Sequence, residues 1–171
     1  MKLVIAEKPS VAQSLARVIG ATKRQDGYLE GNGYLVSWCV GHLVELSAPE
    51  RYDERFAKWR LEDLPILPER FLYEVSAGTS KQYQILKGLM ERPDVESLIC
   101  ATDAGREGEL IFRLVYNQCR CKKPFERLWI SSMEDTAIRE GFPHIIEISL
   151  CWIIMSCRFW ATLNYLTLHP G

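Results

Sequence analysis

The segment 98–111 is the feature that most constrains the fold of this chain. It opens with an apolar run that is typical of a buried strand, reaches Asp103, and then enters an amphipathic helix that begins near Gly105. The chain starts in the same way, because the apolar residues 3–6 lead directly into Glu7 and a second amphipathic helix. Two buried strands that each end at a carboxylate predict a parallel α/β sheet with acids gathered at one edge.

The rest of the pattern agrees with an α/β fold. The sequence Gly31-Asn32-Gly33 predicts a hairpin turn. The segment 49–69 is rich in proline and charge, so we expect it to leave the sheet, with a short helix near 53–60. Helical periodicity recurs over 11–19, 85–90 and 110–115, and strand-like runs lie at 2–7, 34–40, 71–76, 97–102 and 127–131.

The composition indicates an ordinary globular protein but does not indicate a function. A chain of 171 residues that is 47% hydrophobic and 25% charged is long enough to bury one ordinary core. Its net charge of −1 gives no overall attraction for nucleic acid, so DNA binding would need a local patch or further domains.

The cysteines and the N-terminus bear on the compartment. The six cysteines form no CxxC pair, which favours structural thiols over a zinc site. An acid at position 7 interrupts the N-terminal apolar run too early for a signal peptide, so we expect the reducing cytoplasm.

The end of the chain differs from the rest. Residues 143–171 hold only two of the 43 charged residues (21 basic and 22 acidic), Glu147 and Arg158. We therefore expect one domain over 1–142 and an atypical hydrophobic tail over 143–171. Three explanations stay open for the tail: a frame-shifted or truncated end, a packed terminal helix or strand pair, or a membrane span, which Arg158 at its middle disfavours.

The acidic edge predicts a metal site. If their strands are neighbours, Glu7 and Asp103 share an edge, and Glu107, less surely Glu109, projects from the next helical turn. Oxygen ligands alone select a hard cation, and Mg²⁺ commonly takes one or two carboxylates together with a phosphate. The helix that begins near Gly105 also offers free N–H groups to a phosphate. The alternative is that these acids only cap helices.

The basic residues near the acids have two interpretations. Lys8 and Arg106 are either ion-pair partners of the acids or clamps on a phosphate. Lys81 lies in Thr79-Ser80-Lys81-Gln82, a segment that is typical of a helix N-terminus. A contact with a DNA phosphate is the second interpretation. His42 is expected to be a structural or surface histidine. Single-stranded DNA would need a basic track, for which the candidates are Lys81, Lys87, Arg106, Arg113 and Arg127.

Four motifs together resemble the bacterial type IA DNA topoisomerases, in the topoisomerase III branch. The resemblance covers about residues 1–142 and rests on the segments 5–10 (IAEKPS), 38–43 (WCVGHL), 101–111 (ATDAGREGELI) and 127–132 (RLWISS). It implies a Toprim fold, a mainly parallel four-stranded sheet flanked by helices. In that family this domain holds Mg²⁺ and a DNA phosphate while a tyrosine in another domain cleaves single-stranded DNA without ATP.

The resemblance assigns roles to individual residues. It makes Glu7, Lys8, Asp103 and Glu107 the catalytic set, and Glu7, Asp103 and Glu107 the metal ligands. Gly105 stands where the family has a second aspartate, which implies a thinner metal shell. The candidate DNA-phosphate contacts are Lys8, Arg106, Lys81 and Arg127.

The resemblance ends after Phe142. The family's tyrosine motif has no match here, and Tyr165 lies in an unrelated context. We therefore expect no covalent intermediate from this chain alone. The expected partners are single-stranded DNA and the missing topoisomerase domains, with no membrane. Two other classes stay open, a free-standing Toprim phosphotransfer enzyme such as a nuclease or primase-like protein, and a non-catalytic module whose tail recruits a partner.

Overall fold

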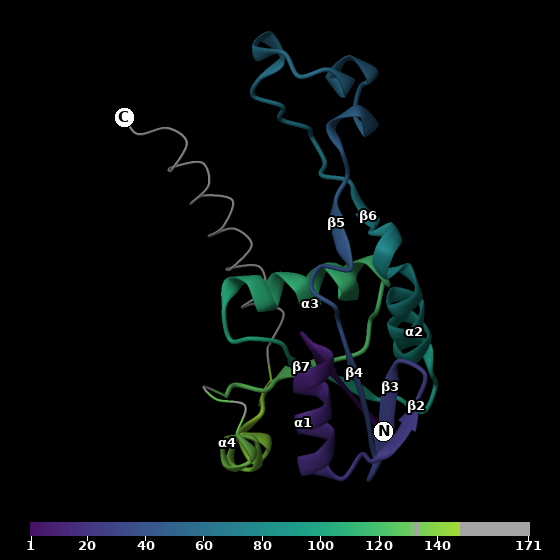
Figure 1. Cartoon of the computed structure of the whole chain (residues 1–171), viewed down its shortest axis with the longest axis vertical. Coiled ribbons are helices and arrows are strands. Elements are labelled where there is room, and N and C mark those ends of the chain that lie inside the picture. The colour runs from purple at the N-terminus through teal and green to yellow at the C-terminus, as the bar shows by residue number, and fades with distance from the viewer. Residues whose placement is uncertain (131, 133, 148–171) are drawn as a thin grey trace.

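The computed structural model describes residues 1–130, 132 and 134–147, and it shows helices packed on both faces of a central sheet (Figure 1). The sheet order is β2-β3-β4-β1-β7-β8-β9. Its strands are β1 (Lys2–Ala6), β2 (Lys23–Gln25), β3 (Tyr28–Gly31), β4 (Tyr34–Trp38), β7 (Ser97–Ala101), β8 (Phe125–Arg127) and β9 (Ile146–Glu147). The α-helices are α1 (Pro9–Ile19), α2 (Ser80–Glu91), α3 (Arg106–Gln118) and α4 (Asp135–Gly141).

The predicted fold class is confirmed. Strands β4, β1, β7 and β8 are mutually parallel and form the expected four-stranded core. The hairpin β2-β3 extends one side of this core and β9 the other, both in antiparallel pairing. The β3–β4 turn has positive φ at Asn32 (49°) and Gly33 (80°), the conformation of a two-residue type I′ hairpin turn.

The predicted strand at 71–76 is present as β6 (Tyr73–Val75), and among the described residues it pairs with β5 (Val44–Leu46) in a separate two-stranded sheet. The predicted strand at 127–131 differs from the structure, because β8 begins at Phe125, whose buried ring lies opposite Leu98, and ends at Arg127.

The helix boundaries follow the expected signals. Helix α1 begins at Pro9 and ends at Ile19, and Gly20 follows it in the left-handed conformation with a φ of 81°. Helix α2 ends before Pro93, and α3 begins one residue after Gly105. The remaining helical segments are short 3-10 turns: η1 (Pro49–Arg51), η2 (Glu54–Ala57), η3 (Leu61–Asp63), η4 (Ala77–Thr79) and η5 (Phe142–His144).

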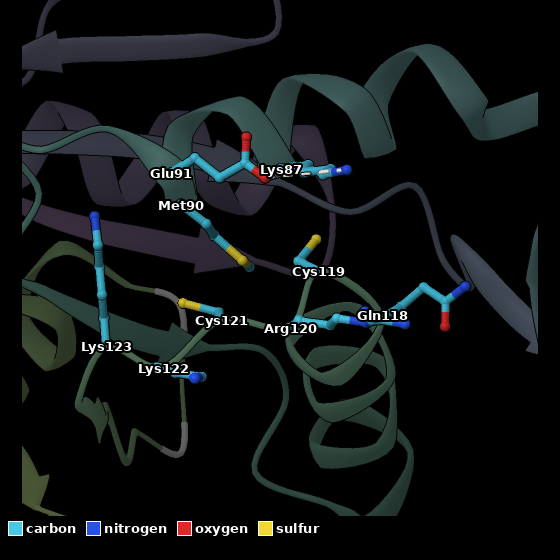
Figure 2. A pocket seen from close by; sticks show the side chains of 9 residues that line it. All are labelled: Lys87, Met90, Glu91, Gln118, Cys119, Arg120, Cys121, Lys122 and Lys123. Carbon is cyan, nitrogen blue, oxygen red and sulfur yellow. Dashed lines mark ion pairs between the residues drawn. The ribbon is translucent and has the colours of Figure 1, made fainter.

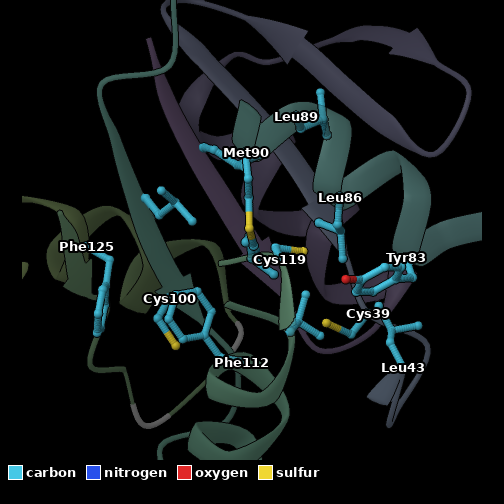
Figure 3. Packing of buried hydrophobic residues seen from close by; sticks show 14 of the residues in the cluster. Cys39, Leu43, Tyr83, Leu86, Leu89, Met90, Cys100, Phe112, Cys119 and Phe125 are labelled. Carbon is cyan, nitrogen blue, oxygen red and sulfur yellow. The ribbon is translucent and has the colours of Figure 1, made fainter. Parts of the chain in front are cut away.

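The alternation of side chains along the central strands divides the core into two layers. Leu3 and Ile5 of β1 face α2 and α3, in a layer that includes Leu86 and Phe112 (Figure 3). Val4 and Ala6 face the opposite side, where α1 and α4 pack. Both faces of the parallel strands are therefore dry, as parallel sheets require.

Between β5 and β6 the chain leaves the sheet as an extended arm, residues 47–72, at the top of Figure 1. It contains η1, η2 and η3, so the expected excursion is present, with its short helix at Glu54–Ala57. Several of its large apolar side chains are exposed, among them Trp59 (79%), Leu61 (90%) and Leu67 (78%).

The described part of the chain extends past the expected domain boundary at Phe142. The Phe142 ring meets the Tyr34 ring edge-on, with centroids 6.0 Å apart, and β9 pairs with β8. Tyr165 and most of the predicted tail over 143–171, from residue 148 on, lie outside the described residues. Within the described ranges, every helix is too short or too polar to cross a membrane.

Candidate functional site

Glu7 and Asp103 follow two neighbouring parallel strands at the same edge of the sheet. Strands β1 and β7 pair with Ala6 opposite Ala101, so Glu7 comes one residue after the last pair and Asp103 two residues after it. Glu7 is largely buried, at 9% exposure, whereas Asp103 is exposed. The two carboxylates thus share an edge of the sheet but differ in their access to solvent.

The backbone of Asp103 lies directly against the start of α3. The hydroxyl of Thr102 donates a hydrogen bond to the Gly108 carbonyl at 2.7 Å. A Cβ atom on Gly108 would overlap the Asp103 carbonyl oxygen and approach the Asp103 nitrogen to 2.8 Å. Glycine at 108 is therefore what allows the helix and the acidic loop to come this close.

A buried arginine supports the same loop from β8. Arg127 is 3% exposed, and its Nη2 donates to the carbonyl oxygens of Thr102, at 3.0 Å, and Asp103. Its Nη1 lies 2.8 Å from Cys100 Sγ and 2.8 Å from Glu109 Oε2. The guanidinium group of this candidate phosphate contact is therefore directed at the protein interior.

Glu109 has a structural position in this arrangement. Its carboxylate accepts from Arg127 and also from Arg113, whose Nε lies 2.6 Å from Oε1. The guanidinium group of Arg113 in turn stacks 4.3 Å from the centre of the Phe125 ring. Both oxygens of Glu109 are thus engaged by arginines.

Glu107 contacts a histidine, His42, for which the sequence predicted no place at the acidic edge. The loop after β4 carries His42, and its Nε2 forms a very short contact with Glu107 Oε1. His42 is at the surface, as expected, but it lies at the acidic edge. One feature of the sequence could have indicated this position. His42 comes just after the predicted strand at 34–40, and in a parallel sheet that strand would end at the same edge as the strand before Glu7.

The predicted basic contacts separate into two groups. Lys8 is exposed and pairs with Glu7 at 3.3 Å, and Arg106 is the exposed first residue of α3, so both belong to the acidic edge. Lys81 lies elsewhere, since its ammonium group pairs at 2.9 Å with Asp26 in the β2–β3 turn. The five-residue basic track is not one surface, because Arg127 is buried and Lys87 lines a cavity described below.

Some of the side chains at this edge are suitable ligands for a hard divalent cation. Glu7 and Asp103 supply oxygen ligands of the kind Mg²⁺ prefers, and one or two carboxylates with a phosphate are its common protein environment. Within the described ranges, no group of three or more His, Cys, Asp and Glu side chains is gathered closely enough to hold a metal. Glu107, in particular, is turned to His42.

Two buried thiols lie beneath the site. Burial raises the pKa of Cys39, after β4, from 9.0 to about 12, and the nearby Cys100 thiol adds to this effect. Burial also raises the pKa of Cys100, although Arg127 opposes the shift. Both thiols are therefore neutral parts of the core, as the absence of a CxxC pair suggested.

The fold and this edge together define a class. The family model for the Toprim domain matches residues 2–133, and the chain belongs to this family. DNA topoisomerase 3 of Bacillus anthracis is 52% identical over 143 residues, covering 84% of this chain and 20% of the relative. DNA topoisomerase 3 of Bacillus subtilis (strain 168) is 51% identical over 140 residues, covering 82% of this chain and 19% of the relative. These matches confirm the resemblance to the topoisomerase III branch.

A solved structure supports the fold. Full-length topoisomerase I from Thermotoga maritima aligns with a TM-score of 0.54 and 23% sequence identity, over 85% of this chain and 21% of that one. The chain spans about one fifth of the length of the curated relatives it matches.

Proposed function

We propose that this chain supplies the Toprim part of a type IA DNA topoisomerase of the topoisomerase III branch. The observation that carries the proposal is the pairing of Ala6 with Ala101, which brings Glu7 and Asp103 to one edge within a segment about half identical to DNA topoisomerase 3. The reaction we infer is ATP-independent breakage, passage and rejoining of single-stranded DNA in the cytoplasm. The nucleophilic tyrosine would come from the remaining domains.

We assign the roles within the site as follows. Glu7 and Asp103 would hold Mg²⁺, which would neutralise charge on a DNA phosphate, and Glu107 would join them only after leaving His42. Lys8 and Arg106 would contact the phosphate from either side of the acids. Arg127 would hold the Asp103 loop, and Lys81 would serve at most as an outlying DNA contact.

The arm offers a surface for the remaining domains. It carries exposed apolar side chains at Trp59, Leu61 and Leu67, and apolar residues left open to solvent can mark interaction sites. It leaves the sheet beyond the carboxyl end of β4, the edge that carries the acids. About four fifths of each relative lies outside the matched segment. We propose that the corresponding part of the topoisomerase covers the arm.

A chimera tests the proposed function. Residues 1–142 would replace the matching segment of DNA topoisomerase 3 from Bacillus subtilis, and relaxation of negatively supercoiled DNA with Mg²⁺ would be measured. We expect relaxation by the chimera, its loss in Asp103→Asn, and its retention in the control Asp26→Asn, which removes an exposed aspartate beside Lys81. A folded chimera without activity, or an active Asp103→Asn variant, would refute the proposal.

The free-standing phosphotransfer alternative makes a different prediction. It expects metal-dependent nicking or synthesis by the isolated chain, abolished by Asp103→Ala. We do not favour it, because relatives at 49–52% identity carry the name DNA topoisomerase 3.

A further inference from the structure

A cavity of about 660 Å³ lies between the end of α2 and the loop that joins α3 to β8 (Figure 2). It is at the edge of the sheet opposite to Glu7 and Asp103, because α3 starts beside Asp103 and its 13 residues run the length of the sheet before reaching Cys119. A helix of that length spans roughly 20 Å. The cavity is therefore separate from the acidic site.

The cavity is strongly basic within a chain whose net charge is −1. Four basic side chains against one carboxylate give its lining a formal charge of +3: Lys87, Arg120, Lys122 and Lys123 against Glu91. A concave surface lined by one sign of charge concentrates the field and attracts anions.

Two of these cations are already engaged. Lys87 lies 4.0 Å from Glu91, the dashed pair in Figure 2, and Lys123 donates to the Arg92 carbonyl. Arg120 and Lys122 are exposed, and no acidic side chain of the described ranges pairs with either of them. These two cations are available to a ligand.

The loop that carries them has a fixed backbone. The Arg120 nitrogen donates to the Asn117 carbonyl at 2.9 Å, the Cys121 nitrogen to Tyr116 at 3.2 Å, and the Tyr116 hydroxyl to Lys123 at 2.8 Å. Arg120 has a φ of 52°, a position just after a helix that usually holds glycine. An arginine at such a position places a cation at the cavity mouth at the cost of backbone strain.

The remaining lining is less polar. Met90 is buried at 2% exposure and Cys119 at 8%, and burial raises the pKa of the Cys119 thiol so that it stays neutral. Cys121 is half-buried beside them. The cavity thus combines sulfur-containing, uncharged side chains with free cations, and its volume falls in the ordinary range for small-molecule sites.

From this combination we propose that the cavity binds one nucleotide unit, with its base against Met90 and Cys119 and its phosphate between Arg120 and Lys122. The unit is either a free nucleotide or one nucleotide of a single DNA strand. Binding here needs no divalent metal, so it is separable from the proposed function of the acidic edge.

The test uses the whole chain in EDTA, with fluorescein-labelled (dT)12 as the probe and fluorescence anisotropy as the readout. The charge-reversing pair Arg120→Glu and Lys122→Glu is compared with Lys23→Glu and Arg24→Glu, two exposed cations of β2 that give the same change of net charge. We expect at least a tenfold loss of affinity in the first double variant and less than a threefold loss in the second. The slope of log affinity against log salt should fall by about 0.7, for the one phosphate contact that is lost, only in the first.

Competitors identify the source of the ligand. Displacement of the probe by thymidine 5′-monophosphate indicates a free-nucleotide site, whereas binding of (dT)12 without such displacement indicates a DNA strand. Equal displacement by inorganic phosphate or by polyglutamate would overturn the proposal, as would equal losses in the two double variants or no probe binding at all.

A second variant guards against misfolding. Arg120→Gly suits the positive φ, so its thermal midpoint should be equal to or above that of the parent. It should nevertheless bind (dT)12 at least threefold more weakly. Unchanged affinity in this folded variant would contradict the role of Arg120.

Discussion

Arg127 Nη1 and Glu109 Oε2 lie 2.8 Å apart, and this ion pair joins β8 to the first turns of α3. The same guanidinium group bonds the carbonyl oxygens of Thr102 and Asp103. The position of the Asp103 carboxylate therefore depends on a cation behind it that does not reach the surface. Arg127 acts on the site by holding its loop.

Replacement of Arg127 by methionine should destabilise the chain by at least about 2 kcal/mol, because hydrogen bonds to a charged group are lost and two loop carbonyls lose their donor. Urea unfolding followed by circular dichroism measures the change. The control is Arg17→Ala, which removes an exposed pair with Asp135 at 2.7 Å and should cost less than about 1 kcal/mol. Equal losses in the two variants would show that the buried position of Arg127 carries no special weight.

Two glycines inside helices should respond oppositely to alanine. At Gly108 a Cβ atom meets the backbone of Asp103, which cannot move without moving the acid, so Gly108→Ala should lower stability. At Gly88 in α2 a Cβ atom meets nothing within 4 Å, so Gly88→Ala should raise stability by about 0.5–1 kcal/mol. Thermal unfolding of both variants checks the pair, and a stabilised Gly108→Ala chain would contradict the observed contact.

Local pattern and topology made much of this fold predictable. The apolar runs before Glu7 and Asp103 located β1 and β7, and their parallel pairing followed from the helices between them. The misplaced start of β8 has a simple cause. Its three residues include the charged side chains of Glu126 and Arg127, so no apolar run marks the strand.

The side-chain partners within the site were not predictable in the same way. Arg127 resembled a surface cation in the sequence, and only the burial of β8 between β7 and β9 turns it inward. The contact of His42 with Glu107 joins residues 65 positions apart through loops, where no periodicity exists to guide a prediction. The positions of the acids in the sequence were enough to locate the acidic edge of the sheet. Which of its side chains are engaged by other residues depends on tertiary packing.

Gly105 is a position where a carboxylate can be added beside the proposed metal ligands. Its φ of −129° is ordinary extended backbone, and a Cβ atom there meets nothing within 4 Å. We expect Gly105→Asp to increase the thermal shift caused by Mg²⁺, because a third oxygen ligand would join the proposed ligands Glu7 and Asp103. Gly105→Asn is the matched control, since both residues cap a helix well but only aspartate adds charge. Equal Mg²⁺ shifts in the two variants would place the metal elsewhere.

The buried thiol of Cys39 predicts a loss of stability in alkali. Its pKa rises from 9.0 to about 12 because burial penalises the thiolate. Between those pH values the unfolded chain releases this proton while the folded chain keeps it, so the stability present below pH 9 falls as the pH rises toward 12. In Cys39→Ala the loss of stability between pH 9 and 11 should be smaller than in the parent, as measured by urea unfolding at each pH.

Alkylation by iodoacetamide at pH 8, followed by mass spectrometry, gives an independent check of the burial of Cys39. Half-buried Cys121 should react much faster than Cys39, and comparable rates would show that the Cys39 thiol is open to solvent, which would remove the cause of its raised pKa.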